Sequence, residues 1–170
     1  MEAQVHGKST QASGLFYRLK MKGVNCELIT EYAKDKTWEN NQVALNNQLY
    51  ISANQIYKQE RVEGQVNVII TDSPIILGLF YWNDNNKDKS TYYKRLIFEI
   101  FYEKNNFNVF VRRKKAYNPI GRNQTEEQAK ELDNKIGNLL SDNKLIYTTV
   151  DGTVAGLEEI FDIVSRKIGL

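Results

Sequence analysis

Residues 7–10 read GKST, a combination that can bind the phosphates of a nucleotide. In such a loop, backbone amides at the positive end of the following helix point toward the phosphates. A lysine reaches the β- and γ-phosphates, and a serine or threonine hydroxyl binds magnesium. Lys8 is therefore a candidate catalytic residue and Ser9 a candidate magnesium ligand. The candidate nucleotide-binding residues of this loop are Gly7, Lys8, Ser9 and Thr10.

The first half of this loop departs from the complete pattern GxxxxGK[ST]. The first glycine would stand at position 2, where the sequence has Glu2, and the intervening AQVH contains no glycine. Glu2 brings a carboxylate near the phosphates, and Val5 lacks the freedom of glycine at positive φ. We interpret the motif as a degenerate or N-terminally truncated Walker A loop.

Two acidic residues follow apolar runs that predict strands. Glu31 follows residues 24–30, and Asp72 follows residues 66–71 in VNVIITDSP. Open α/β sheets bind ligands at the carboxyl ends of their strands, so both acids are predicted to face one crevice. Asp72 could bind magnesium directly or through water. The alternatives stay open: Glu31 as an acid at a helix N-terminus, and Asp72 as part of a turn.

A basic segment, RRKKAYNPIGRNQTEEQAKELD, follows a further apolar run. Its Pro and Gly turn and its arginines are typical of a lid, which we expect at about residues 112–127. Guanidinium groups match phosphate oxygens and can neutralise charge during phosphoryl transfer. Contact with nucleic acid and ordinary solvated charge are the alternatives. The candidate phosphate contacts are Arg112, Arg113 and Arg122.

The elements that must position these residues alternate along the chain. Apolar, β-branched runs predict strands, and their continuous apolar character favours a parallel sheet covered on both faces. The alternation predicts an α/β doubly wound fold. The polar residues 83–90 predict a loop. Strands are predicted at residues 24–30, 66–71, 108–113 and 145–150, and helices at 9–22, 44–61, 91–103, 125–140 and 155–168.

The composition narrows the class of protein. A length of 170 residues with 41% hydrophobic residues predicts a single domain with one core. The net charge of +2, with scattered basic residues, does not favour nucleic acid as a partner. No signal peptide or membrane span is evident, and the single cysteine, Cys26, permits no internal disulfide. We therefore expect a cytoplasmic protein.

Five segments together resemble a family: GKSTQASGLFYRLK, ITEYAKD, QLYISANQ, IITDSPIILGLFY and YNPIGRNQTEEQ. Residues 7–170 resemble a P-loop kinase-like ATPase family that is common in bacteriophages. That family is similar to the ribosylnicotinamide kinase domain of NadR, and more distantly to deoxynucleoside and nucleoside monophosphate kinases. The resemblance implies ATP and Mg²⁺ as cofactors, and the host cytoplasm as the location if a phage encodes the chain.

The resemblance also implies a P-loop NTPase fold, a parallel sheet in the order 2-3-1-4-5 with helices on both faces. A phosphate loop follows the first, central strand, but only six residues precede Gly7. We therefore expect the central strand to be missing. Residues upstream of Met1 are the explanation we prefer, and a natural loss of the strand is the alternative.

The family further implies roles for individual residues. Glu31 matches the general base that acts on the accepting hydroxyl, and Asp72 matches the acid after the third strand. Gln55 and Arg61 match positions that contact substrate, and Gln48 matches less closely. For these three residues, an ordinary polar helix face is the alternative.

The resulting hypothesis is an ATP-binding protein that transfers the γ-phosphate to a small nucleoside or nucleotide-like acceptor. A regulatory, nucleotide-binding ATPase without a small-molecule acceptor is one alternative, and an inactive truncated copy is another. The sequence identifies neither the acceptor nor the oligomeric state.

Overall fold

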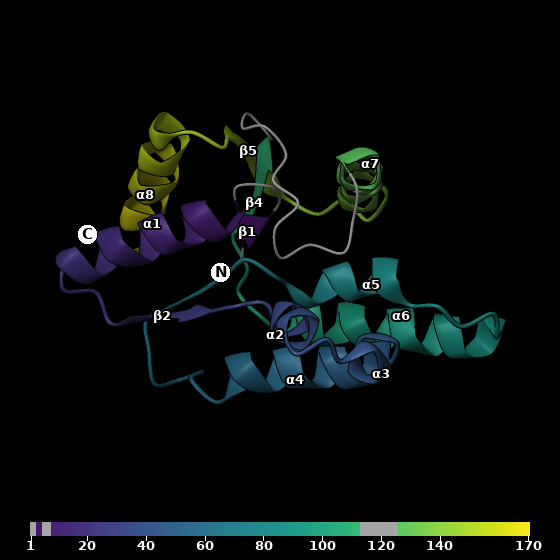
Figure 1. The fold of residues 1–170 in the computed structure, drawn as a ribbon. Helices are drawn as coiled ribbons and strands as arrows, with labels where there is room; N and C mark the ends of the chain where they lie inside the picture. The colour runs from purple at the N-terminus through teal and green to yellow at the C-terminus, as the bar shows by residue number, and fades with distance from the viewer. Residues whose placement is uncertain (1–2, 5–7, 113–125) are drawn as a thin grey trace.

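The computed structural model describes residues 3–4, 8–112 and 126–170. Its strands and helices alternate, as the sequence predicts for an α/β protein (Figure 1). All strand pairs are parallel. The strands are β1 (Ala3–Gln4), β2 (Cys26–Ile29), β3 (Val68–Thr71), β4 (Asn108–Arg112) and β5 (Tyr147–Asp151).

The helices differ in length, and two very short ones follow each other directly in the segment after β3. The helices are α1 (Lys8–Met21), α2 (Tyr32–Trp38), α3 (Gln42–Leu45), α4 (Gln48–Glu60), the 3-10 helix η1 (Ile75–Leu77), α5 (Gly78–Tyr81), α6 (Lys87–Tyr102), α7 (Glu126–Asp142) and α8 (Val154–Ile168).

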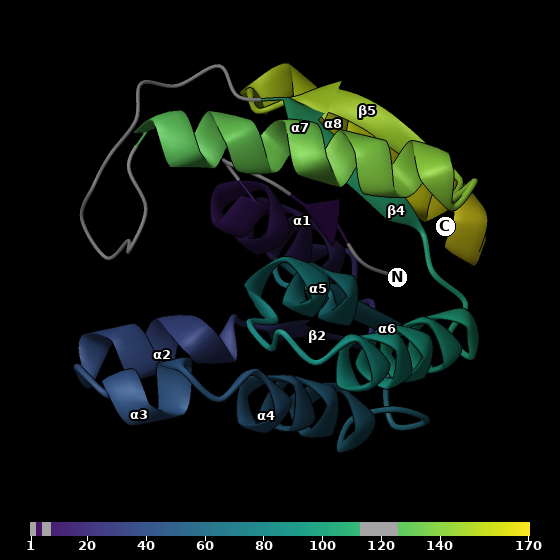
Figure 2. The ribbon, with the colours of Figure 1, turned by 90° about the vertical axis from the view of Figure 1, so that its right-hand side faces the viewer.

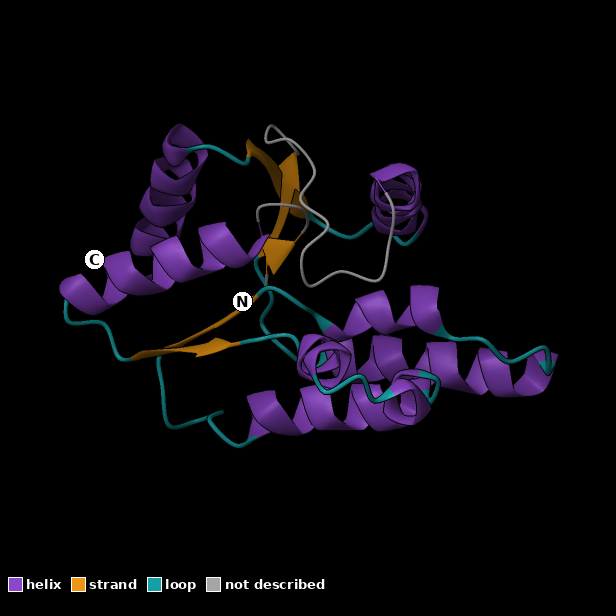
Figure 3. Cartoon of the chain, in the orientation of Figure 1, coloured by secondary structure: helices purple, strands orange, loops and turns teal. Residues whose placement is uncertain are grey.

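The strands form two hydrogen-bonded pieces, which Figure 3 draws as separate groups of arrows. One piece has the order β1-β4-β5, and the other pairs β2 with β3. Cα atoms of β1 and β3 nevertheless come within 8 Å of each other. β1 is thus the edge strand of the first piece. It is hydrogen-bonded to β4 on one side, and β3 of the other piece lies near it.

The presence of β1 corrects the expectation that the first strand is missing. Ala3 pairs with Val109, and Gln4 pairs with Phe110, in the register of a parallel ladder. The ladder is made by backbone groups, so a two-residue strand forms here without the apolar run that would predict it. Hydrophobic periodicity cannot detect so short an element.

Polar N-cap residues explain two further differences from the predicted elements. The helix predicted at residues 44–61 is divided into α3 and α4, because the side chain of Asn47 accepts a hydrogen bond from Tyr50 N and starts a new helix. In the predicted loop 83–90, Asn86 accepts from Lys89 N, and α6 already begins at Lys87. A third difference is α2, which lies in a segment for which neither a helix nor a strand was predicted.

Helices cover both sides of β4 and β5: α1 and α8 on one side and α7 on the other (Figures 1 and 2). One apolar cluster fills the space among α1, α8 and the strands, and includes Leu19, Val111 and Val164. A second cluster joins η1, α6 and α7, and includes Ile97 and Ile136. Among the described helices, none has the length and apolar character needed to cross a membrane.

Candidate functional site

The first turn of α1 meets the end of β3 through two predicted magnesium ligands. The hydroxyl of Ser9 donates a hydrogen bond to Oδ2 of Asp72 at 2.5 Å, although 63 positions separate the two residues. Asp72 is 6% exposed, and its second oxygen, Oδ1, is buried without a hydrogen-bond partner in the described part of the chain. A buried, half-satisfied carboxylate is unfavourable unless a cation or a donor pairs with it.

The segment after β3 holds Asp72 in this place. β3 is built of apolar and β-branched residues and ends in Thr71, which is fully buried. The hydroxyl of Thr71 accepts a hydrogen bond from Ser73 N at 3.1 Å, which makes the chain turn directly after the strand. The turn that was the alternative for Asp72 is thus present, and it presents the carboxylate to Ser9.

The oxygen donors of this pair suit magnesium. Mg²⁺ prefers oxygen ligands, and it usually takes one or two protein carboxylates, with waters and substrate phosphates completing its shell. Among the described residues, no group of three His, Cys, Asp or Glu side chains could hold a metal ion. The hydroxyl of Ser9 and the two oxygens of Asp72 therefore fit Mg²⁺ bound to a nucleotide.

The N-terminus of α1 suits an anion. The first turn carries no acidic side chain, whereas Arg18 and Lys20 lie in the last turn, so the charges complement the helix dipole. Thr10 is exposed in the first turn. Lys8 is the first residue of α1, but its side chain and Gly7 lie outside the part that the structure describes.

A buried glutamine, which the sequence analysis did not single out, ties α1 to the loop after β5. Nε2 of Gln11 donates to Thr153 O at 2.8 Å, and Gln11 is 5% exposed. Thr153 in turn caps α8 by accepting from Gly156 N. A Cβ atom on Gly156 would lie 1.9 Å from Asp151 O, so glycine is needed for this close approach. The only signal in the sequence was a polar residue on the buried face of a helix.

Glu31 lies at the same edge of the sheet as Asp72. Ile29 of β2 pairs with Thr71 of β3, so the two acids follow neighbouring strand ends by two residues and one residue. Neighbouring strands are about 4.8 Å apart. Glu31 is half-buried, occupies the N-cap position of α2, and makes no cap hydrogen bond with its side chain.

Gln55 reaches the same place from α4. Its Oε1 accepts a hydrogen bond from Tyr32 N, directly after Glu31, at 2.8 Å. Gln55 is 5% exposed, and its Nε2 has no hydrogen-bond partner among the described residues. The structure therefore brings this predicted substrate contact to Glu31. Arg61 is exposed at the C-cap of α4, about 9 Å farther along the helix axis, and its Nε bonds to Lys58 O.

The face of α4 that carries Gln55 is polar although it is buried. Nε2 of Gln48 donates to Ser52 Oγ at 3.2 Å, and this hydroxyl lies 2.7 Å from the hydroxyl of Tyr93. Burial raises the pKa of Tyr93, while its bonds to Ser52 and Gln48 act in the opposite direction. Gln48 thus belongs to a buried polar network. The buried polar residues of this face are Gln48, Ser52, Gln55 and Gln59.

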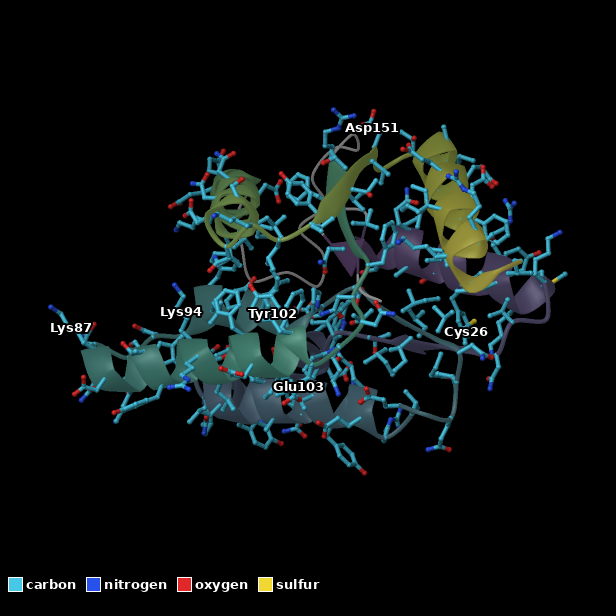
Figure 4. All side chains as sticks on the ribbon, turned by 180° about the vertical axis from the view of Figure 1, so that it is seen from behind. Cys26, Lys87, Lys94, Tyr102, Glu103 and Asp151 are labelled. Atoms are coloured by element: carbon cyan, nitrogen blue, oxygen red, sulfur yellow. The ribbon has the colours of Figure 1, made fainter. Side chains whose placement is uncertain are left out.

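Arg112 lies at the carboxyl end of β4 and is the register partner of Asp151. Asp151, at the end of β5, is labelled in Figure 4. Nε of Arg112 forms an ion pair with Oδ1 of Asp151 at 2.7 Å. The guanidinium side chain is 58% exposed, so the pair adds less than about 1 kcal/mol to stability. Arg113, Arg122 and most of the predicted lid lie outside the described residues.

No protein-family model matches this sequence, and no curated protein matches it. The functional assignment depends on the residues and on the contacts described above.

Proposed function

We propose that the chain is a magnesium-dependent phosphotransferase, which moves the γ-phosphate of ATP to a hydroxyl of a small nucleoside or nucleotide-like acceptor. The observation that carries this proposal is the contact between Ser9 and Asp72, with one carboxylate oxygen left unpartnered among the described residues. A hydroxyl at the start of a helix and an acid at the end of a buried strand are the two protein ligands expected for magnesium on a nucleotide.

The residues of α1 would bind the phosphates of ATP. Its first-turn amides and its dipole attract the anion, and Lys8 adds a positive charge. Ser9 and Asp72 would hold Mg²⁺, which neutralises charge on the phosphates when it is bound. The protein contributes mainly position and charge, which is where most of the rate enhancement in phosphoryl transfer arises.

Glu31 is the proposed general base for the acceptor. It lies at the strand end next to Asp72, and its carboxylate is half-buried and not used in a helix cap. It would take the proton of the acceptor hydroxyl as the oxygen attacks phosphorus. The amide Nε2 of Gln55 is the proposed hydrogen-bond donor to the acceptor. Arg112 would contact the transferred phosphate, with its guanidinium retained at the sheet edge by Asp151.

The metal and nucleotide site can be tested by titration calorimetry with ATP, with and without Mg²⁺. Ser9→Ala should weaken Mg²⁺-dependent binding at least about tenfold, because it removes one of two protein ligands. Ser13→Ala is the matched control, since Ser13 lies one turn later on α1 and is exposed. A folded wild-type protein that shows no Mg²⁺-dependent heat with ATP would refute the proposal.

The transfer step needs a second assay, with radiolabelled ATP and a panel of ribonucleosides, deoxynucleosides and nicotinamide riboside. We expect labelled product from at least one acceptor and loss of it in Glu31→Gln. If ATP binds but no acceptor is phosphorylated, the result would instead support a regulatory nucleotide-binding protein.

A further inference from the structure

The N-terminus of α2 is capped by a residue from another helix. α2 begins at Tyr32, and the preceding Glu31 has an extended backbone with φ −62° and ψ 118°. Glu31 makes no cap hydrogen bond with its side chain. Instead, Gln55 of α4 provides an acceptor for the first backbone N–H of α2, through the bond from Tyr32 N to Oε1.

Four other helices are capped by their own N-cap residue. In the described part, four helices have an N-cap residue whose own side chain accepts from the first turn, as is usual for Asn, Ser, Thr and Asp. α2 instead has a glutamate at this position, and its first N–H bonds to a side chain 23 residues away. The four internal caps are Asn41 for α3, Asn47 for α4, Asn86 for α6 and Thr153 for α8.

The orientation of the Gln55 amide follows from this bond. A backbone N–H must meet an oxygen, so Oε1 faces Tyr32 and Nε2 is the opposite end of the amide. The side chain is buried, which limits its movement. α2 and α4 are also joined by the ion pair between Asp35 and Lys58 at 2.8 Å, so α4 is a stable support for α2.

We propose that Gln55 is a positioning residue for Glu31: its bond to Tyr32 N anchors the peptide group directly after the glutamate, and so holds Glu31 in its place after β2. This inference rests on the proposed role of Glu31 as general base. The N–H of Tyr32 belongs to the planar peptide group that also contains the carbonyl of Glu31, so fixing this N–H limits the rotation of the backbone that carries the glutamate.

Two substitutions separate this role from direct contact with the acceptor. Gln55→Met keeps the length of the side chain and removes the acceptor oxygen. Gln55→Glu keeps an oxygen for Tyr32 N but removes the Nε2 donor. Gln59→Met is the matched control, because Gln59 is a buried glutamine one turn later on the same face of α4. Circular dichroism verifies that each variant is folded.

The two readouts are amide hydrogen exchange at Tyr32 and steady-state phosphoryl transfer from Mg-ATP to the nucleoside panel. In Gln55→Met, we expect exchange at Tyr32 to accelerate and kcat to fall, each about tenfold, with the KM for ATP unchanged. Gln55→Glu should retain the slow exchange at Tyr32, and its KM for the acceptor should rise, because it lacks the Nε2 donor. Gln59→Met should match the wild type in both measurements.

Three results would overturn parts of this reasoning, and they can be told apart. Unchanged exchange at Tyr32 in folded Gln55→Met would show that Gln55 does not cap α2. An unchanged kcat in folded Gln55→Met, combined with a raised KM for the acceptor, would show that Gln55 acts on the acceptor through Nε2 and does not position Glu31. Absence of transfer by the wild-type protein would refute the proposed function and the role of Gln55 in it, whereas the exchange data would still decide the cap.

Discussion

Replacing Asp72 by asparagine should make the protein more stable and at the same time unable to respond to magnesium and ATP. Asp72 is 6% exposed, and its Oδ1 has no hydrogen-bond partner in the described structure. Leaving a buried polar group unsatisfied costs roughly 1 to 3 kcal/mol, and more for a charged group. The asparagine keeps an oxygen for the Ser9 hydroxyl and replaces the unpartnered Oδ1 by a neutral amide group, so the additional cost of the charge is removed.

We therefore expect Asp72→Asn to raise the free energy of unfolding by about 1 to 2 kcal/mol without ligand. For a chain of this length, each 1 kcal/mol corresponds to about 2 to 4 °C in Tm. In the wild-type protein, Mg-ATP at about 100 times its Kd should add about 2.7 kcal/mol of stability. The variant should lose this increment, because the site lacks its anionic ligand for magnesium.

Urea unfolding with and without Mg-ATP measures both effects. Asp84→Asn is the control, because Asp84 lies in the loop before α6 and its carboxylate accepts from Asn86 N at 2.8 Å. That control should keep the stabilisation by Mg-ATP. A ligand-free Asp72→Asn protein that is less stable than the wild type would refute the reasoning, since it would mean that the carboxylate is fully satisfied by the protein.

Three further predictions concern the elements around the site. Gly156→Ala should lower the free energy of unfolding by about 3 kcal/mol, because its Cβ would lie 1.9 Å from a backbone oxygen. Its control is Gly137→Ala in α7, where a Cβ atom meets open space; this change should raise the free energy of unfolding by about 0.5 kcal/mol or more. Thr153→Ala should cost about 1 kcal/mol in urea unfolding, because α8 loses its cap. For Tyr93, burial raises the pKa in the folded state, so stability present below about pH 10 is lost as the pH rises through the folded pKa. The free energy of unfolding of Tyr93→Phe should therefore fall less steeply above pH 10 than that of the wild type. The same dependence on pH in both proteins would contradict this.

Local patterns in the sequence predict much of the fold. Apolar, β-branched runs predict the four longer strands, and helical periodicity predicts α1, α6, α7 and α8 to within a few residues. These signals are local, because side-chain spacing reflects which face of one element is buried. Ser9, Glu31 and Asp72 could be chosen for the same reason, since each lies directly at the end or the start of a predicted element.

Only the tertiary structure decides which of these residues meet. The bond between Ser9 and Asp72 spans 63 positions, and the cap of α2 by Gln55 spans 23. The strand β1 has no sequence signal, because its two residues are held by backbone pairing with β4. Such contacts arise from packing and hydrogen bonding between distant segments, whereas hydrophobic periodicity records only whether a side chain is buried, and not what it is buried against.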